Sequence, residues 1–127
     1  MKVQAISNNK NHQQTFESAK TKFNDEARVI IDRKFSPKKK QILEQLIKDA
    51  DQKTQYVTEI QIKYDKLLGG FITLYDLKSG GTRIDVRKKW FQSLMSYIKK
   101  SFNTALELDN WIINKKNETT PFAPNNN

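Results

Sequence analysis

The sequence predicts an α+β domain: a small mixed sheet of three strands packed on two helices, with a long C-terminal helix after it. Three observations predict this fold. Residues 56–64 alternate apolar and polar side chains, as a half-buried strand does. A second apolar run at residues 71–75 follows the pair Gly69 and Gly70. From residue 90 onward, large apolar residues recur every three or four positions, which is the spacing of one helix face.

Length and composition indicate one domain with polar ends. The chain has 127 residues, of which 36% are hydrophobic and 29% charged. Its two ends are rich in Asn, Gln and other polar residues, and such segments bury too little apolar surface to offset the entropy of ordering. We predict disordered tails at residues 1–15 and 118–127, a domain at 16–100 and a helical extension at 101–117.

The N-terminal third predicts a helix, a strand and a second helix. Residues 16–24 repeat apolar side chains at helical spacing, whereas residues 27–32 are β-branched and short, which favours a strand. Ser36 and Pro37 then form a typical helix start. The Ser hydroxyl can accept a hydrogen bond from an unpaired backbone N–H of the first turn, and Pro fits the first helical position. This helix should reach about residue 51, with a buried stripe of Ile42, Leu43, Leu46, Ile47 and Ala50.

In the middle of the chain we expect two strands joined at the glycine pair. Gly69 and Gly70 should allow a bend or bulge, and residues 76–81 should form a hairpin loop. The alternation of the first strand places one set of residues on a single face: Tyr56, Thr58, Ile60, Ile62 and Tyr64.

The final helix should begin near residue 87, with Asp85 as its cap. It either continues for ~30 residues, which would span ~45 Å and make part of it project, or breaks near residues 101–104. We expect Trp90 and Leu94 to form the core with Ile42 and Leu46. The exposed part of the helix would then bind a partner through Tyr97, Phe102, Leu106, Trp111 and Ile112.

The residues that most enzymes need are scarce. There is no cysteine, and the single histidine, His12, lies in the predicted N-terminal tail. The two glycine pairs lack the Gly-Lys-Ser/Thr sequence that opens a helix in a P-loop. We therefore expect a protein that is not an enzyme, without metal or cofactor. We also find no apolar run long enough to cross a bilayer and no evident targeting segment.

A formal net charge of +9 favours an acidic partner, which could be nucleic acid, an anionic membrane surface or an acidic protein helix. The cations form two groups, one at residues 33–40 and one at residues 83–100. In the second group they alternate with aromatic residues such as Trp90 and Phe91. This mixture is typical either of RNA binding or of a helix with aromatic residues inside and lysines in solvent.

From about residue 27 to residue 100 the chain resembles the C-terminal domain of the ATP synthase delta subunit, called the oligomycin-sensitivity-conferring protein in mitochondria. That domain has a strand, a helix with a Leu-Ser-like start, a second strand, an apolar pair before Gly-Gly, a third strand and a closing segment that leads into a helix. Residues 27–32 would be the first strand, and Ser36 would start the helix. The motif residues that match are Leu67, Leu68, Gly69, Gly70 and Phe71, followed by Val86 and Arg87 at the end of the closing segment. Asp85 of that segment stands where the family has Ser, and it can still cap a helix.

The resemblance implies a stator component of a rotary F-type ATP synthase or related ATPase, peripheral to an energy-transducing membrane, on the matrix side of the mitochondrial inner membrane or the inner face of a bacterial one. Its partners would be the helix of the peripheral-stalk subunit and the subunits of the catalytic head. The N-terminal helical domain of the family is lacking here, so another chain would supply the grip on the head. A small basic ribosomal or RNA-binding protein is the alternative that composition and size favour.

Overall fold

The computed structural model describes residues 18–81 and 83–119. The order of elements is β1 (Thr21–Phe23), α2 (Asp25–Lys34), α3 (Pro37–Lys53), β2 (Val57–Asp65), β3 (Gly70–Leu77), β4 (Asp85–Arg87) and α4 (Leu94–Thr119). The predicted α+β class and the long C-terminal helix are confirmed. Among the described residues, however, the sheet has four strands, one more than predicted.

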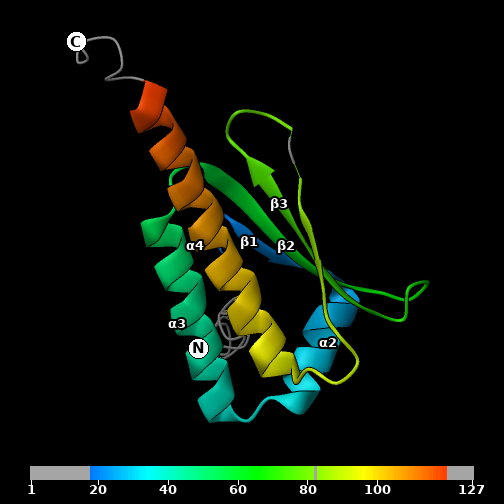
Figure 1. The fold of residues 1–127 in the computed structure, drawn as a ribbon. Coiled ribbons are helices and arrows are strands. Elements are labelled where there is room, and N and C mark those ends of the chain that lie inside the picture. The colour runs from blue at the N-terminus through cyan, green and yellow to red at the C-terminus, as the bar shows by residue number, and fades with distance from the viewer. Residues whose placement is uncertain (1–17, 82, 120–127) are drawn as a thin grey trace, which may run out of the picture.

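The sheet is mixed, with the strand order β1-β2-β3-β4. β1 runs parallel to β2, while the pairs β2–β3 and β3–β4 are antiparallel. Figure 1 shows α3 and α4 side by side and running in the same direction, with the strands behind them. The core lies between these helices, α2 and one face of the sheet, and its largest fully buried side chains include Tyr75, Tyr97, Phe102, Ile31 and Leu43.

The first two predicted elements are wrong in type. Residues 21–23, predicted as helix, form β1, whose three residues are too few to show an alternating pattern. Residues 27–32, predicted as a strand, lie inside α2. Asn24 caps that helix, acidic residues fill its first turn and basic residues its last, all of which favour a helix. Burial of Ala27 and Ile31, four positions apart, gives α2 one apolar face.

The predicted second helix is confirmed as α3. Ser36 is its N-cap, with its Oγ accepting a hydrogen bond from the backbone N–H of Lys39 at 3.3 Å, and Pro37 begins the helix. The predicted stripe is correct for its buried centre, Leu43, Ile47 and Ala50, whereas Leu46 is only half-buried. Ile42 is on the exposed edge, which corrects its predicted place in the core.

β2 departs from strict alternation near its start. Ile60 and Ile62 are buried on the helix-facing side as predicted, but Thr58 is exposed and Val57 is buried. The reason is a register shift between Val57 and Glu59, which inserts one extra residue and moves Val57 to the inner face.

The glycine pair lies at the β2–β3 hairpin, which agrees with the predicted bend. Residues 66–69 form the connecting turn, and Gly69 adopts φ 71°, a left-handed conformation that favours glycine. Gly70 is the first residue of β3 and pairs with Asp65. The loop between β3 and β4 spans residues 78–84 and is longer than the predicted turn, which ended at residue 81.

α4 begins later than predicted. Asp85 is an exposed residue of β4 and does not cap the helix; Ser93 does, with its Oγ accepting from the backbone N–H of Ser96 at 3.1 Å. Trp90 therefore precedes the helix and is 90% exposed, which corrects its predicted place in the core. The helix is continuous for 26 residues, and its C-terminal turns project beyond α3 (Figure 1).

The predicted boundary between domain and extension, at residues 100 and 101, falls inside α4, where Phe102 and Ala105 belong to the core. The predicted tail at residues 1–15 and most of the predicted tail at residues 118–127 lie outside the described residues. No helix in the described ranges is long and apolar enough to cross a membrane.

Candidate functional site: a cationic groove

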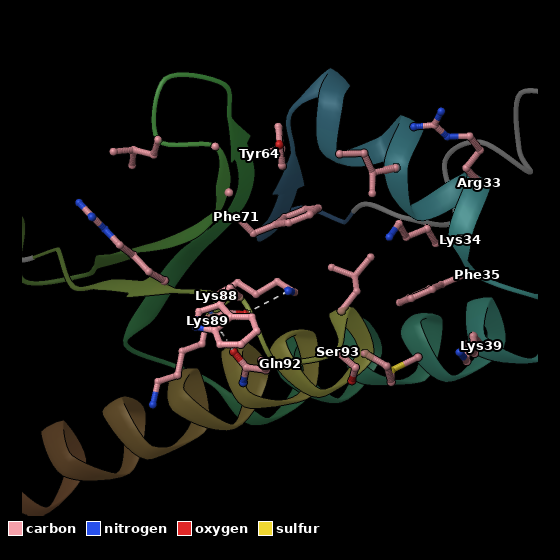
Figure 2. Close-up of a pocket in the computed structure, with 18 residues that line it drawn as sticks. Arg33, Lys34, Phe35, Lys39, Tyr64, Phe71, Lys88, Lys89, Gln92 and Ser93 are labelled. Carbon is pink, nitrogen blue, oxygen red and sulfur yellow. Dashed lines mark hydrogen bonds between the residues drawn. The ribbon is translucent and has the colours of Figure 1, made fainter.

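One open cavity of about 1060 Å³ lies between the α2–α3 turn, the β2–β3 hairpin and the loop that leads into α4 (Figure 2). We call it the cationic groove. Its apolar lining residues come from all of these elements, and two of them, Phe35 and Phe71, are each only 6% exposed. The full apolar and aromatic lining is Ile30, Phe35, Tyr64, Leu68, Phe71, Trp90, Leu94 and Met95.

Six cationic residues line the groove, and none of its described lining residues is Asp or Glu. In Figure 2, Lys34 and Lys88 extend from opposite sides of the groove, with Phe71 between them. In the described parts of the chain, none of the six forms an ion pair. Because like charges held close together repel one another, an anionic ligand would be favoured here. The six are Arg33, Lys34, Lys39, Arg87, Lys88 and Lys89.

The fold brings together the two groups of cations that are separate in the sequence. Arg33 and Lys34 occupy the last turn of α2, where positive charge is favoured by the helix dipole. Arg87 ends β4, and Lys88 donates its backbone N–H to the carbonyl oxygen of Phe71 at 3.0 Å, which ties the α4-leading loop to β3. Lys99 and Lys100, from the same sequence group, lie on the exposed face of α4 outside the groove.

Two apolar loop tips flank the groove. Leu67 and Leu68, on the β2–β3 hairpin, are 98% and 51% exposed, and Trp90 and Phe91, before α4, are 90% and 68% exposed. The rings of Trp90 and Phe91 contact each other edge to face, with centroids 5.5 Å apart. Four of the seven exposed large hydrophobic residues of the described chain are thus on these two loops.

The predicted motif residues fall in and around this groove. Leu68, Gly69, Gly70, Phe71 and Arg87 line it. Leu67 precedes them on the hairpin, and Asp85 and Val86 belong to the adjacent strand β4.

The predicted partner-binding residues on α4 divide into three groups. Tyr97 and Phe102 are 0% and 1% exposed, so the structure places them in the core and not on a binding surface. Leu106 and Ile112 are half-buried. Trp111 is 58% exposed on the C-terminal half of α4. None of these five residues lines the groove.

Sequence reasoning missed the contribution of the α2–α3 turn, where Phe35 and Lys39 lie beside the groove. It also predicted Trp90 in the core, whereas its side chain is 90% exposed. A signal was present: Ser93 and the residues after it form a helix start, so the aromatic pair before it lies outside the helix.

Among the described residues, no group of three or more His, Cys, Asp or Glu side chains could hold a metal ion. The clearest pKa shifts belong to Tyr75 and Tyr97, whose pKa values burial raises. The Tyr97 hydroxyl hydrogen-bonds Thr73, the Tyr75 hydroxyl donates to the carbonyl oxygen of Ser101, and neither tyrosine lines the groove.

The comparisons with known proteins return no relative. No family model matches the chain, and no curated protein or solved structure matches it either.

Proposed function

We propose that this protein is a non-enzymatic peripheral-stalk component of a rotary F-type ATP synthase or related ATPase, acting without a cofactor. In this role it binds a helix of the stalk subunit and links it to the catalytic head, at the periphery of an energy-transducing membrane. The observation that carries the proposal is the cationic groove, which combines an apolar floor with six cations and, among its described lining residues, no carboxylate. An amphipathic helix binds such a groove through its apolar face.

The order of elements supports the same proposal. The resemblance implies strand, helix, strand, glycine pair, strand, closing segment and helix, and the elements β1, α3, β2, β3, β4 and α4 follow in this order. The correspondence differs at the start. The resemblance implies the first strand at residues 27–32, but these residues lie inside α2, and the first strand is β1 at Thr21–Phe23. The motif residues Leu67 to Phe71 form the hairpin between β2 and β3, where the resemblance places them.

An RNA-binding role is the second candidate, and the exposed Trp90 among cations favours it, because such a ring stacks on bases. Other features do not support it. The rings of Phe35 and Phe71 are 6% exposed and leave no free face for stacking. On the sheet face away from the helices, the register aligns Lys22, Gln61, Leu74 and Asp85, a row with no aromatic residue.

Affinity purification of the tagged full-length chain from its native cells tests the proposal. We expect stalk and catalytic-head subunits of a rotary ATPase among the co-purifying proteins at ~0.15 M salt. Recovery of RNA or ribosomal proteins without any ATPase subunit would overturn the proposal, and loss of that RNA on raising the salt would identify phosphate contacts as its basis.

A further inference from the structure

The two loop tips beside the cationic groove are held in shape before any partner binds. On the hairpin, Asp65 Oδ1 accepts hydrogen bonds from the backbone N–H groups of Leu67 and Leu68, at 2.9 and 3.2 Å. The N–H of Gly69 donates to the carbonyl oxygen of Asp65 at 2.8 Å. This turn therefore presents both leucines in a fixed conformation, although neither is covered.

The loop before α4 is fixed in a similar way. The backbone N–H of Gln92 donates to the carbonyl oxygen of Lys89 at 3.1 Å, and the N–H of Lys89 donates to Oε1 of Gln92 at 3.2 Å. Trp90 and Phe91 lie inside this closed turn. Exposed apolar side chains on a preformed turn lose little conformational entropy on binding, which makes them effective anchors.

We propose that the two tips grip an amphipathic helix of the partner subunit, apolar on one face and acidic along both edges of that face. This inference rests on the proposed function, and it names the chemistry and the contacts of the partner. Leu67 and Leu68 would contact the helix from one side of the groove, and Trp90 and Phe91 from the other.

Charge complementarity selects the acidic helix. Arg33, Lys34 and Lys39 come from the α2–α3 side, while Arg87, Lys88 and Lys89 come from the β4–α4 side, so a helix lying in the groove would have cations along both edges. Two carboxylates at the hairpin already have partners. Asp65 binds the turn amides, and Glu26 pairs with Lys66 at 3.3 Å. The exposed aliphatic side chains of Leu67 and Leu68 favour the apolar face of a helix over nucleic acid, because they offer no ring on which a base could stack.

The test uses the full-length chain and synthetic helical peptides of about 20 residues, a length that spans ~30 Å. One peptide has Leu at positions i, i+3, i+4 and i+7 with Glu beside this face, a second has Lys in place of Glu, and a third has the acidic residues with the apolar face scrambled. We expect only the first to bind, measured by fluorescence anisotropy at ~0.15 M salt.

Matched variants locate the contact. Trp90→Ala should weaken binding at least about tenfold, as loss of a central aromatic anchor does, and Leu67→Ala/Leu68→Ala should also weaken it. Trp111→Ala is the control, because Trp111 is an exposed Trp outside the groove. For the charges, Lys88→Glu/Lys89→Glu should abolish binding, whereas Lys99→Glu/Lys100→Glu makes the same charge change on the exposed face of α4 and should retain most of it.

Several outcomes would overturn the inference. Loss of peptide binding in Trp111→Ala but not in Trp90→Ala would move the contact to α4. Equal binding of the scrambled peptide, or binding only to an RNA oligonucleotide or to phosphatidylserine vesicles, would exclude helix capture by the tips. The proposed function fails separately: if the acidic peptide binds at Trp90 but no ATPase subunit co-purifies, the groove chemistry stands and the stator assignment does not.

Discussion

Asp109 on α4 accepts a hydrogen bond from the backbone N–H of Val57 at 3.0 Å, across 52 positions of sequence. The same oxygen, Oδ1 of Asp109, accepts hydrogen bonds from the backbone N–H groups of Gln55 and Tyr56, at 2.9 and 2.5 Å. One buried carboxylate therefore binds three successive amides where α3 has ended and β2 begins. It joins α4 to the start of β2, beside the register shift between Val57 and Glu59.

We predict that Asp109→Ala destabilises the fold by about 2–4 kcal/mol, because it leaves the buried amide of Val57 and the partly buried amides of Gln55 and Tyr56 without their acceptor. Asp109→Asn should cost less, since it retains one acceptor oxygen. The free energy of unfolding from urea titration measures both changes. Glu107→Ala, an exposed change on the same helix, is the control. An Asp109→Ala variant as stable as the control would contradict the structural role.

The buried tyrosines predict sensitivity to alkaline pH. Burial is the largest cause that raises the pKa of Tyr75, the nearby Tyr97 is the second, and burial also raises the pKa of Tyr97. Below the ordinary tyrosine pKa of about 10, both are neutral in either state, and their contribution to stability is complete. Above it, the unfolded chain releases protons that the folded protein retains, so stability falls as the pH rises.

Urea unfolding of the wild type and Tyr75→Phe at pH 8 to 11 measures this effect. The wild type should lose stability more steeply than Tyr75→Phe above pH ~10. Identical pH profiles would show that the burial of Tyr75 does not control the alkaline limit.

The N-cap residues of α2 and α3 should contribute different amounts to the free energy of unfolding. Ser36 only caps its helix, so Ser36→Ala should cost about 1 kcal/mol. Asn24 caps α2 through Ala27 at 3.0 Å and also bonds both the N–H and the carbonyl oxygen of Tyr64 at 3.0 Å, which joins α2 to β2. Asn24→Ala should therefore cost about 2–3 kcal/mol. Thermal and urea unfolding compare the pair, and equal costs would mean that the bonds to Tyr64 add no stability.

The glycine pair should respond unequally to substitution. Gly69 has a positive φ of 71°, whereas the φ of Gly70 is not positive. At both positions an added Cβ would meet no atom within 4 Å. Gly69→Ala should therefore destabilise by about 1–2 kcal/mol through backbone strain alone, and Gly69→Asn by less. Gly70→Ala is the matched control and should be nearly neutral. A larger loss at Gly70 would indicate a constraint other than backbone conformation.

Prediction from the sequence succeeded where a long pattern meets a clear boundary. α3 combines the start at Ser36 and Pro37 with a buried face at Leu43, Ile47 and Ala50. The hairpin at Gly69 follows from a strand pattern and a residue that tolerates positive φ. It failed where patterns were short. The segment 27–32, with Val29, Ile30 and Ile31 at its centre, fits a strand or a helix equally, and the N-cap at Asn24 favours the helix α2.

The groove was predicted only in its parts. The sequence showed two groups of cations and an apolar pair before Gly69, but not that Lys34 and Lys88 lie on opposite sides of Phe71. The exposure of Trp90 also depends on where α4 begins. Helical spacing continues through residues 90–94, whereas the chain runs as a turn until Ser93.

Composition and local patterning by themselves determined that this chain forms an α+β domain with a strong positive charge, a hairpin at its glycines and a long final helix. Those properties depend on neighbours within a few positions, where helix caps, turn conformations and side-chain alternation act. Only the tertiary structure decided which aromatic residues are covered and that distant cations share one groove. Burial and electrostatic potential depend on distances in space, and the packing of β1, α2 and the start of α4 sets those distances.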